Sequence, residues 1–238
     1  MTDHPILFTA SMVRGLLREI ERPGTGKTQT RRNGHLKRLR RFGAITEFGQ
    51  SDTRGYDWHF RDRGMRWHDL RHSELLAVLP YQAGDRLWVR EAWHAARSLN
   101  GTAPRDIPRD ADIEYAATKR SYADIGLVGK PRPSMYLPRW ASRITLYVTD
   151  VRVQRLQDIS REDALAEGVQ RVGGGMLRWE NWSAAEGQSG TSPQAAYALL
   201  WNNINGPGSW DANPWVAAYT FVPRLGNIDA MPATAEAA

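Results

Sequence analysis

Two basic segments carry the residue types best suited to binding an anion. The first, Lys27-Thr28-Gln29-Thr30-Arg31-Arg32, places an amine, hydroxyls and guanidinium groups within one short run. The second, Lys37-Arg38-Leu39-Arg40-Arg41, has no acidic neighbour. Such side chains neutralise phosphates, although a solvated basic loop has the same composition. The sequence therefore predicts a nucleic-acid contact at Lys37, Arg38, Arg40 and Arg41, with a solvated loop as the alternative.

Charge and aromatic content favour the same kind of ligand. The chain has 32 Lys and Arg residues against 26 Asp and Glu residues, a formal net charge of +6, and this sign steers polyanions toward a surface. Several of the ten tryptophans stand beside Arg, Asn or Asp, as in Arg139–Trp140 and Trp210–Asp211. Such aromatic rings stack on nucleobases, but tryptophan is also a large core residue. A base-stacking role and a packing role both stay open.

Other classes of site are poorly supported. The absence of cysteine excludes disulfides, thiolate zinc sites and a cysteine nucleophile, and agrees with a reducing cytoplasm. His68 and His72 are spaced for one helix face but lack an evident third ligand, so we expect no metal and no cofactor. Gly24-Thr25-Gly26-Lys27-Thr28 lacks the first glycine of a phosphate-binding loop. We expect a cytoplasmic protein without a signal peptide, membrane span or membrane partner.

Short elements must position these residues. Apolar residues at helical spacing predict a helix over 12–21, ended by Pro23 and Gly24. Strands are expected over 27–32, 86–93, 112–116, 144–153 and 215–222, and further helices near 160–168 and 195–204. Ser160 with Asp163 three residues later is typical of a helix N-cap.

We predict a single domain over residues 1–225, with insertions at about 33–82, 97–133 and 170–192 and a disordered tail over 226–238. The first insertion is polar and is interpreted as a long, partly mobile loop. Short strands, few helices and long insertions indicate an α+β, mainly β fold, a small β-barrel with flanking short helices.

The order of the motifs resembles the ASCH family of the PUA-like superfamily, in particular its larger, phage-type members. The resemblance rests on the Lys27–Arg32 run after a short helix, Gly84-Asp85-Arg86-Leu87-Trp88-Val89-Arg90-Glu91, the long strand, and Ile159 to Gly168. Pro138-Arg139-Trp140-Ala141-Ser142-Arg143 and Trp210-Asp211-Ala212-Asn213-Pro214-Trp215-Val216 extend it. Together the motifs cover roughly half of the chain. The family implies a PUA-like barrel with a cleft that takes a nucleoside, nucleotide, RNA or DNA, in a bacterial or phage-infected host cell.

One small branch of this family removes the acyl group from N4-acetylcytidine with a lysine, a threonine and a glutamate. By motif these fall on Lys27, Thr30 and Glu167. In such an amidohydrolase a threonine hydroxyl needs a base, and a lysine can serve if desolvation or nearby cations lower its pKa. The carboxylate of Glu167 would orient the groups or shuttle the proton. The chain is about twice as long as these deacylases, so its insertions can reshape the cleft.

Further residues are candidates for lining the cleft, each with a structural alternative such as an ion pair, a core position or a turn. They are Arg31, Arg32, Arg90, Glu91, Trp93, Arg139, Ser142, Arg143, Asn213 and Trp215. Three functions stay open at this point: deacylation of a modified cytosine, binding of RNA or DNA without chemistry, and a phage morphogenesis or host-interaction role through protein contacts. The sequence does not indicate an oligomeric state.

Overall fold

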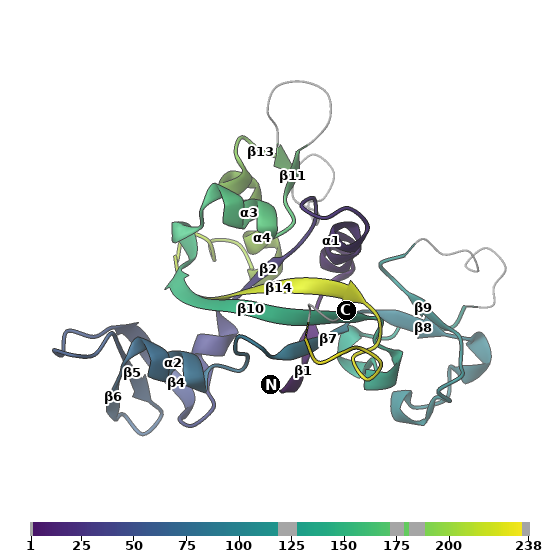
Figure 1. Cartoon of the computed structure of the whole chain (residues 1–238), viewed down its shortest axis with the longest axis horizontal. Coiled ribbons are helices and arrows are strands. Elements are labelled where there is room, and N and C mark those ends of the chain that lie inside the picture. Colours follow the sequence, from purple (N-terminus) through teal and green to yellow (C-terminus); the bar gives the residue numbers. More distant parts are fainter. Residues whose placement is uncertain (1, 119–127, 172–178, 181–188, 235–238) are drawn as a thin grey trace. The chain divides into compact units, whose positions relative to one another are not determined.

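The computed structural model describes residues 2–118, 128–171, 179–180 and 189–234. The chain forms two compact units. Unit 1 contains Met1–Thr28, Gly84–Tyr147 and Val222–Ala238, and unit 2 contains Gln29–Ala83 and Val148–Phe221. Strands β10 (Ile144–Arg155) and β14 (Trp215–Leu225) each contribute residues to both units (Figure 1). Whether the units form one domain, as expected, stays a prediction.

Unit 1 is built around a parallel strand pair. Strand β1 (Asp3–Leu7) runs parallel to β7 (Arg86–Arg90), and the start of β10 pairs antiparallel with β7. Helix α1 (Ala10–Glu21) begins where the Thr9 hydroxyl accepts a hydrogen bond from the Met12 amide, and it buries Val13 and Leu16. The helix predicted over 12–21 is therefore confirmed. Its Thr N-cap stabilises the first turn, because it satisfies an amide that would otherwise lack a partner.

The insertion predicted at 97–133 belongs to unit 1 and contributes a small core. Strand β8 (Trp93–Ala95) pairs with β9 (Ile113–Tyr115), and Trp93, Ile107 and Leu137 pack together. The connecting 3-10 turns are η2 (Arg97–Leu99), η3 (Pro104–Asp106), η5 (Ser134–Tyr136) and η6 (Arg139–Ala141). Residues 119–127 of this insertion lie outside the described part.

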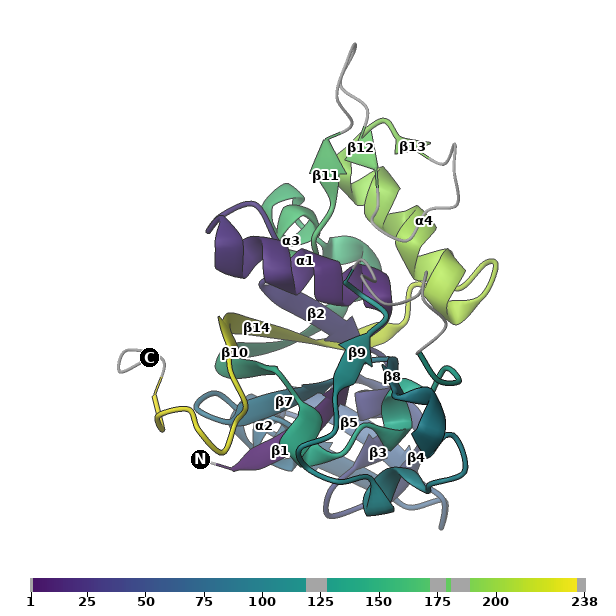
Figure 2. The same cartoon turned by 90° about the vertical axis from the view of Figure 1, so that its right-hand side faces the viewer.

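Unit 2 combines strands with helices α3 and α4. Strand β2 (Gln29–Arg32) pairs antiparallel with β14. The 3-10 turn η7 (Leu156–Asp158) leads to helix α3 (Arg161–Ala166), which packs with α4 (Pro193–Asn205) over a core that includes Leu156, Leu200 and Trp201. Figure 2 shows α3 and α4 close to β11 (Gln170–Arg171). Strands β12 (Trp179–Glu180) and β13 (Ser189–Gly190) complete a small sheet, and the rest of the insertion expected at 170–192 is outside the described residues.

The expectation of a loop over 33–82 was wrong. After η1 (Gly34–Leu36), strands β3 (Arg38–Leu39), β4 (Gly43–Gln50), β5 (Trp58–Asp62) and β6 (Trp67–Leu70) form a sheet in that order. Helix α2 (His72–Val78) follows. The inner face of the sheet is largely aromatic, since Phe60 stacks on His68 and contacts Phe42. Aromatic and histidine rings supply the buried area that aliphatic runs would otherwise provide.

The tail also differs from its prediction. Ile228 is fully buried, and the Asn227 side-chain amide donates to the backbone carbonyls of Arg139, Trp140 and Ser142 at 2.8, 3.1 and 2.8 Å. These bonds order the described part of the chain beyond residue 226, because buried carbonyls need a donor.

The elements together confirm mainly β structure with a few helices as the fold class. Closure into a PUA-like barrel stays a prediction.

Candidate functional site

The loop after α1 fixes the position of Lys27 within unit 1. The Glu19 carboxylate accepts hydrogen bonds from the amides of Gly24 and Gly26 at 2.8 and 2.7 Å. Gly26 has no room for a side chain, since a Cβ there would lie 2.3 Å from the Glu19 backbone nitrogen. The Lys27 side chain is fully buried, with Nζ 5.9 Å from the centroid of the Phe8 ring. A solvated loop lysine is thus ruled out for this position.

A buried ionic cluster occupies unit 2 beside β2. The Arg31 guanidinium donates to Asp163 Oδ2 at 2.7 Å, to Glu167 Oε1 at 3.1 Å and to Gln29 Oε1 at 2.5 Å. The side chain of Arg31 is 0% exposed and that of Glu167 is 3% exposed. We call Gln29, Arg31, Asp163, Glu167 and Tyr197 the Arg31 cluster. Charges this deeply buried persist only when they are paired and hydrogen bonded.

Helices α3 and α4 supply the acidic and phenolic members of the Arg31 cluster. The Ser160 hydroxyl caps α3 by accepting from the Asp163 amide at 3.0 Å, as predicted. Glu167 follows the last helical residue as the C-cap instead of lying in the last turn. The Tyr197 hydroxyl of α4 donates to Glu167 Oε1 at 3.4 Å. Burial, together with the negative charge of Glu167, raises the pKa of Tyr197 well above its usual value, so this phenol stays protonated.

Asp163 remains ionised despite its partial burial. Burial acts to raise the pKa of the carboxyl, but hydrogen bonds from Arg152 and Gln29 and the charges of Arg31 and Arg152 outweigh it and hold the pKa below the usual value. Arg152 Nη2 donates to Asp163 Oδ1 at 3.0 Å. Together with Arg152, the Arg31 cluster brings two arginines and two carboxylates into contact and links β2, β10 and α3 within unit 2.

Thr30 lies on the other face of β2. Side chains alternate along a strand, so Thr30 points away from the face shared by Gln29 and Arg31. Its cross-strand neighbour is Tyr219, whose hydroxyl lies 2.8 Å from His35 Nδ1. Thr30 is 1% exposed and thus borders an aromatic group rather than solvent. Glu167, by contrast, engages Arg31 on the first face.

The three predicted catalytic residues consequently differ in their surroundings. Lys27 belongs to unit 1, whereas Thr30 and Glu167 belong to unit 2. Each is buried, and the structure gives Glu167 an ion-pair partner that the sequence did not reveal. Their convergence on one substrate stays a prediction.

The predicted basic patch is exposed. Lys37, Arg38, Arg40 and Arg41 all reach solvent, while the intervening Leu39 is fully buried. A hydrogen bond from the Arg40 amide to the Val78 carbonyl, 3.0 Å long, holds this turn against the end of α2. Four cations are therefore presented from an anchored strand and turn. Arg32 is half-buried, and burial lowers the pKa of its guanidinium.

Several predicted ligand-binding residues of unit 1 have partners within the protein. Glu91 is buried and accepts two hydrogen bonds from Arg143, at 2.9 and 3.0 Å, while burial raises the pKa of its carboxyl. The Arg143 guanidinium lies 4.0 Å from the centroid of the Tyr115 ring. Ser142 is buried and donates to the Val89 carbonyl at 2.9 Å. Trp93, a candidate for lining the cleft, is fully buried in the core of unit 1, so no face of its ring is open to a ligand.

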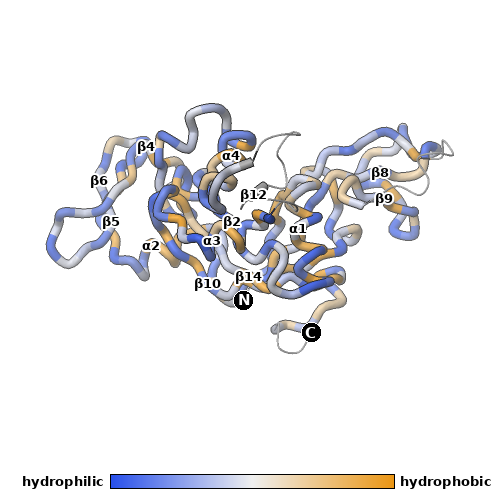
Figure 3. Tube along the Cα trace, turned by 90° about the horizontal axis from the view of Figure 1, so that it is seen from above, coloured by the Kyte–Doolittle hydropathy of each residue, from blue (hydrophilic) through white to orange (hydrophobic). Residues whose placement is uncertain are grey.

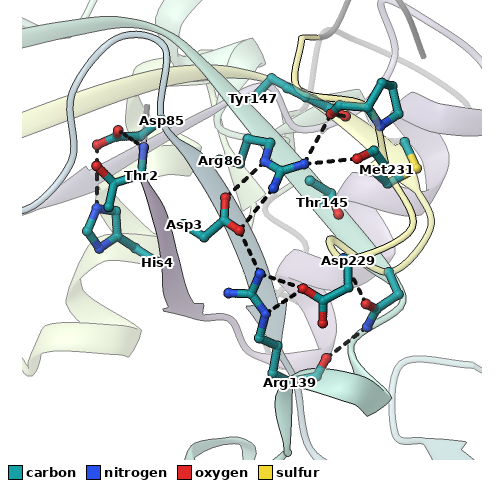
Figure 4. A network of polar contacts seen from close by, with 12 residues as sticks. Thr2, Asp3, His4, Asp85, Arg86, Arg139, Thr145, Tyr147, Asp229 and Met231 are labelled. Carbon is teal, nitrogen blue, oxygen red and sulfur yellow. Dashed lines mark hydrogen bonds and ion pairs between the residues drawn. The ribbon is translucent and has the colours of Figure 1, made fainter.

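Arg139 joins the N-terminal strand to the tail. Its Nη2 lies 2.6 Å from both Asp3 Oδ2 and Asp229 Oδ1, and Asp3 also binds Arg86 (Figure 4). The Arg139 Nε and Nη2 donors and the Arg86 guanidinium bind carboxylates and carbonyls of unit 1, which favours the ion-pair alternative over phosphate binding. Arg90 likewise donates to the Met135 carbonyl.

The last two predicted residues lie in unit 2. Asn213 has a left-handed backbone, with φ of 39°, and its Oδ1 accepts from the Gln157 amide at 2.9 Å. It therefore forms a turn, as the Asn-Pro alternative indicated. Trp215 is half-buried, 5.0 Å from the Trp58 ring and 4.4 Å from the Arg155 guanidinium.

The sequence did not predict two members of the Arg31 cluster or the pocket of unit 1. Gln29 joins the Arg31 cluster through Asp163 of α3, and Tyr197 joins it through Glu167, and neither contact can be read from sequence spacing. A pocket in unit 1 is lined by residues of the second insertion, among them Arg97, Asp112 and Glu114, and by none of the predicted ligand-binding residues. Within the described residues no group of three His, Asp or Glu side chains is arranged to hold a metal ion, and none of the helices found there is long and apolar enough to cross a membrane.

Comparisons with known proteins add no relative. No family model, no curated protein and no solved structure matched the chain.

Proposed function

We propose that the chain is an ASCH-type protein that binds a nucleoside, nucleotide or nucleic acid, with the basic patch of Lys37, Arg38, Arg40 and Arg41 as the main contact for phosphates. The fold proposed with this function is a PUA-like barrel, and the observed strands would be part of it. The proposal draws on the ordered motifs of the sequence and on the charge of the patch.

The exposure of the basic patch is the observation that carries the proposal. Leu36 and Leu39 are buried on either side of Lys37 and Arg38, so the backbone is anchored while the cations extend into solvent. Among the described residues, no carboxylate forms an ion pair with Lys37, Arg38 or Arg41. Unpaired cations on a rigid turn neutralise phosphates without first losing an internal partner.

Binding should be measured by fluorescence anisotropy of dye-labelled single-stranded and duplex oligonucleotides over a range of salt concentrations. Replacing Lys37, Arg38 and Arg41 by alanine is expected to weaken binding to all sequences. On single strands it should reduce the slope of log K against log salt by up to about 2, since each neutralised phosphate contributes about 0.7.

The matched control replaces Arg105, Arg109 and Lys130 of unit 1, which are equally exposed, and removes the same charge. If both triple variants weaken binding equally, net charge and not the patch is responsible. If the wild-type protein shows no binding at low salt, the proposed function is wrong.

A second candidate is hydrolysis of an N4-acylated cytosine by Lys27, Thr30 and Glu167. The complete burial of Lys27 favours it, because burial disfavours the charged form of an amine and a neutral amine can act as the base. In the proposed reaction Thr30 Oγ1 attacks the acyl carbon, the bond to N4 breaks, and the amine leaves with a proton supplied through Lys27. Water then releases the acid from the threonine, so the net reaction consumes one water.

The ion pair between Arg31 and Glu167 weighs against a direct role of Glu167 in this reaction. Incubation with N4-acetylcytidine, followed by chromatographic detection of cytidine, tests the candidate. Turnover that is lost in Lys27→Met and Thr30→Val, with unchanged circular dichroism, would support it. Absence of turnover by the wild type would leave only the binding function.

A further inference from the structure

The outer face of the β4–β6 sheet carries aromatic and basic side chains, together with the carboxylates of Glu47, which pairs with Arg61, and Asp69, which lies opposite His59. In β5, Trp58, Phe60 and Asp62 point inward, so His59 and Arg61 point outward. In the register of the sheet, Arg61 pairs with Trp67 of β6, and His59 pairs with Gly49 of β4. We call His59, Arg61 and Trp67 the outer platform.

The rings of the outer platform contact one another but remain accessible. The His59 and Trp67 ring centroids are 5.0 Å apart, and the Arg61 guanidinium lies 5.5 Å from the Trp67 ring centroid. The His59 ring lies over Gly49, because a Cβ at this glycine would be 3.1 Å from His59 Nε2. Trp67 is 52% exposed, an unusual state for the largest side chain of a strand.

The inner face explains why the outer platform is rigid. Phe60 is fully buried and stacks on His68, with ring centroids 5.0 Å apart. Trp58 stacks on Phe48 and contacts Trp215 of β14 edge to face. The sheet is therefore anchored through one side, and the rings on the other side are held in place without a covering element from the same segment.

The charge around the outer platform favours an anionic ligand. Residues 33–83 contain nine Lys and Arg residues and six Asp and Glu residues. Five of the six carboxylates already accept bonds from neighbouring groups of the segment, and these are Glu47, Asp57, Asp62, Asp69 and Glu74. Arg63 and Arg66, in the turn between β5 and β6, are both exposed, and the Arg66 guanidinium also lies 3.0 Å from Asp62 Oδ2. Figure 3 shows the trace around β5 and β6 as mostly hydrophilic with single hydrophobic positions between.

From this combination we propose that the outer platform binds single-stranded nucleic acid, with a nucleobase stacked on the exposed part of Trp67 and the backbone phosphates near Arg63 and Arg66. The proposal rests on the proposed function and names its ligand as a single-stranded polymer. Stacking on an aromatic ring accepts any base, and flanking cations hold the backbone. A duplex keeps its bases stacked inside and offers no free face to Trp67.

Strand β6 is also the last strand in its sheet, which raises self-association as the alternative. An exposed sheet edge with an aromatic residue can pair with a second copy. The excess of basic groups on this segment opposes such pairing, because two copies would bring like charges together. The experiment below distinguishes self-association from nucleic-acid binding.

The test measures anisotropy of a dye-labelled thymidine oligomer with the wild type, Trp67→Ala and Trp67→Phe. Trp67→Ala is expected to weaken single-strand binding by about tenfold or more, since that is the usual effect of removing one stacking ring. Trp67→Phe should recover most of the affinity, and neither change should alter the salt slope. Tyr136→Ala, at a 53% exposed aromatic of unit 1, is the control and should leave affinity unchanged.

The outcomes separate this inference from the proposed function. If Trp67→Ala binds as the wild type does while the basic-patch variant is impaired, the platform inference is wrong and the proposed function survives. If no oligonucleotide binds the wild type, both fail. If Trp67→Ala instead converts a dimer to a monomer in sedimentation velocity, with oligonucleotide affinity unchanged, the face is a contact between copies of the chain.

Discussion

Replacing Arg31 by methionine should destabilise the protein strongly. The side chain of Arg31 is 0% exposed and holds the carboxylates of Asp163 and Glu167 at 2.7 and 3.1 Å. Asp163 keeps its bond to Arg152 in the variant, whereas Glu167 loses its ion pair with Arg31 and remains buried. Breaking a buried pair from one side costs about 3–5 kcal/mol, because the remaining charge loses a large part of its compensation.

Urea unfolding followed by far-ultraviolet circular dichroism measures this loss. With a dependence on urea of about 2–3 kcal/mol/M, the midpoint should fall by about 1–2 M. The loss is a large part of the 5–15 kcal/mol that stabilises a typical domain, so the experiment is best done at low temperature.

Two further variants test the reasoning. Glu167→Gln in the Arg31→Met background removes the uncompensated charge and should recover a good part of the stability, although Glu167→Gln alone destabilises. Arg54→Ala changes an exposed arginine of the same unit and should stay within about 0.5 kcal/mol of the wild type. If Arg31→Met costs as little as Arg54→Ala, or if the second substitution brings no recovery, the Arg31 cluster does not carry the stability assigned to it.

Two other expectations concern parts of the chain away from this cluster. Burial and the nearby charge of Arg32 lower the pKa of His35 to about 3, so His35 stays neutral in the folded protein, whereas in the unfolded chain it takes up a proton near pH 6.5. The free energy of unfolding should therefore fall by up to about 1.4 kcal/mol per pH unit as the pH decreases below 6.5. His35→Gln should remove this pH dependence in urea titrations between pH 7 and 5. Asn227→Ala removes the side-chain donor that three backbone carbonyls share, of which the Arg139 carbonyl keeps its bond from the Ser142 amide, and should cost about 1–3 kcal/mol and expose the tail to limited proteolysis. Asp229→Asn, at an exposed ion pair, should change stability by no more than about 1 kcal/mol, and equal protease resistance of Asn227→Ala and the wild type would contradict the role given to Asn227.

Local signals in the sequence identified many of the elements. The apolar spacing before Pro23 predicted α1, and Ser160 with Asp163 predicted the cap of α3, because both patterns act within one or two helical turns. The long strand β10 was equally clear from its alternating aliphatic residues. The sheet of residues 38–70 was missed, although Trp58, Phe60 and Asp62 alternate inward and Gly64 marks the turn. Its core is made of aromatic and histidine rings, which a search for aliphatic alternation passes over.

The chemical types at the candidate site were set by the sequence alone, but their states were decided by tertiary structure. The amine of Lys27, the hydroxyl of Thr30 and the cations at 37–41 are present whatever the fold. Only packing buries Lys27 and gives Glu167 an arginine partner. Arg31 and Glu167 are 136 positions apart in the sequence. Ion pairing and burial depend on distances in space, and sequence spacing does not report such distances.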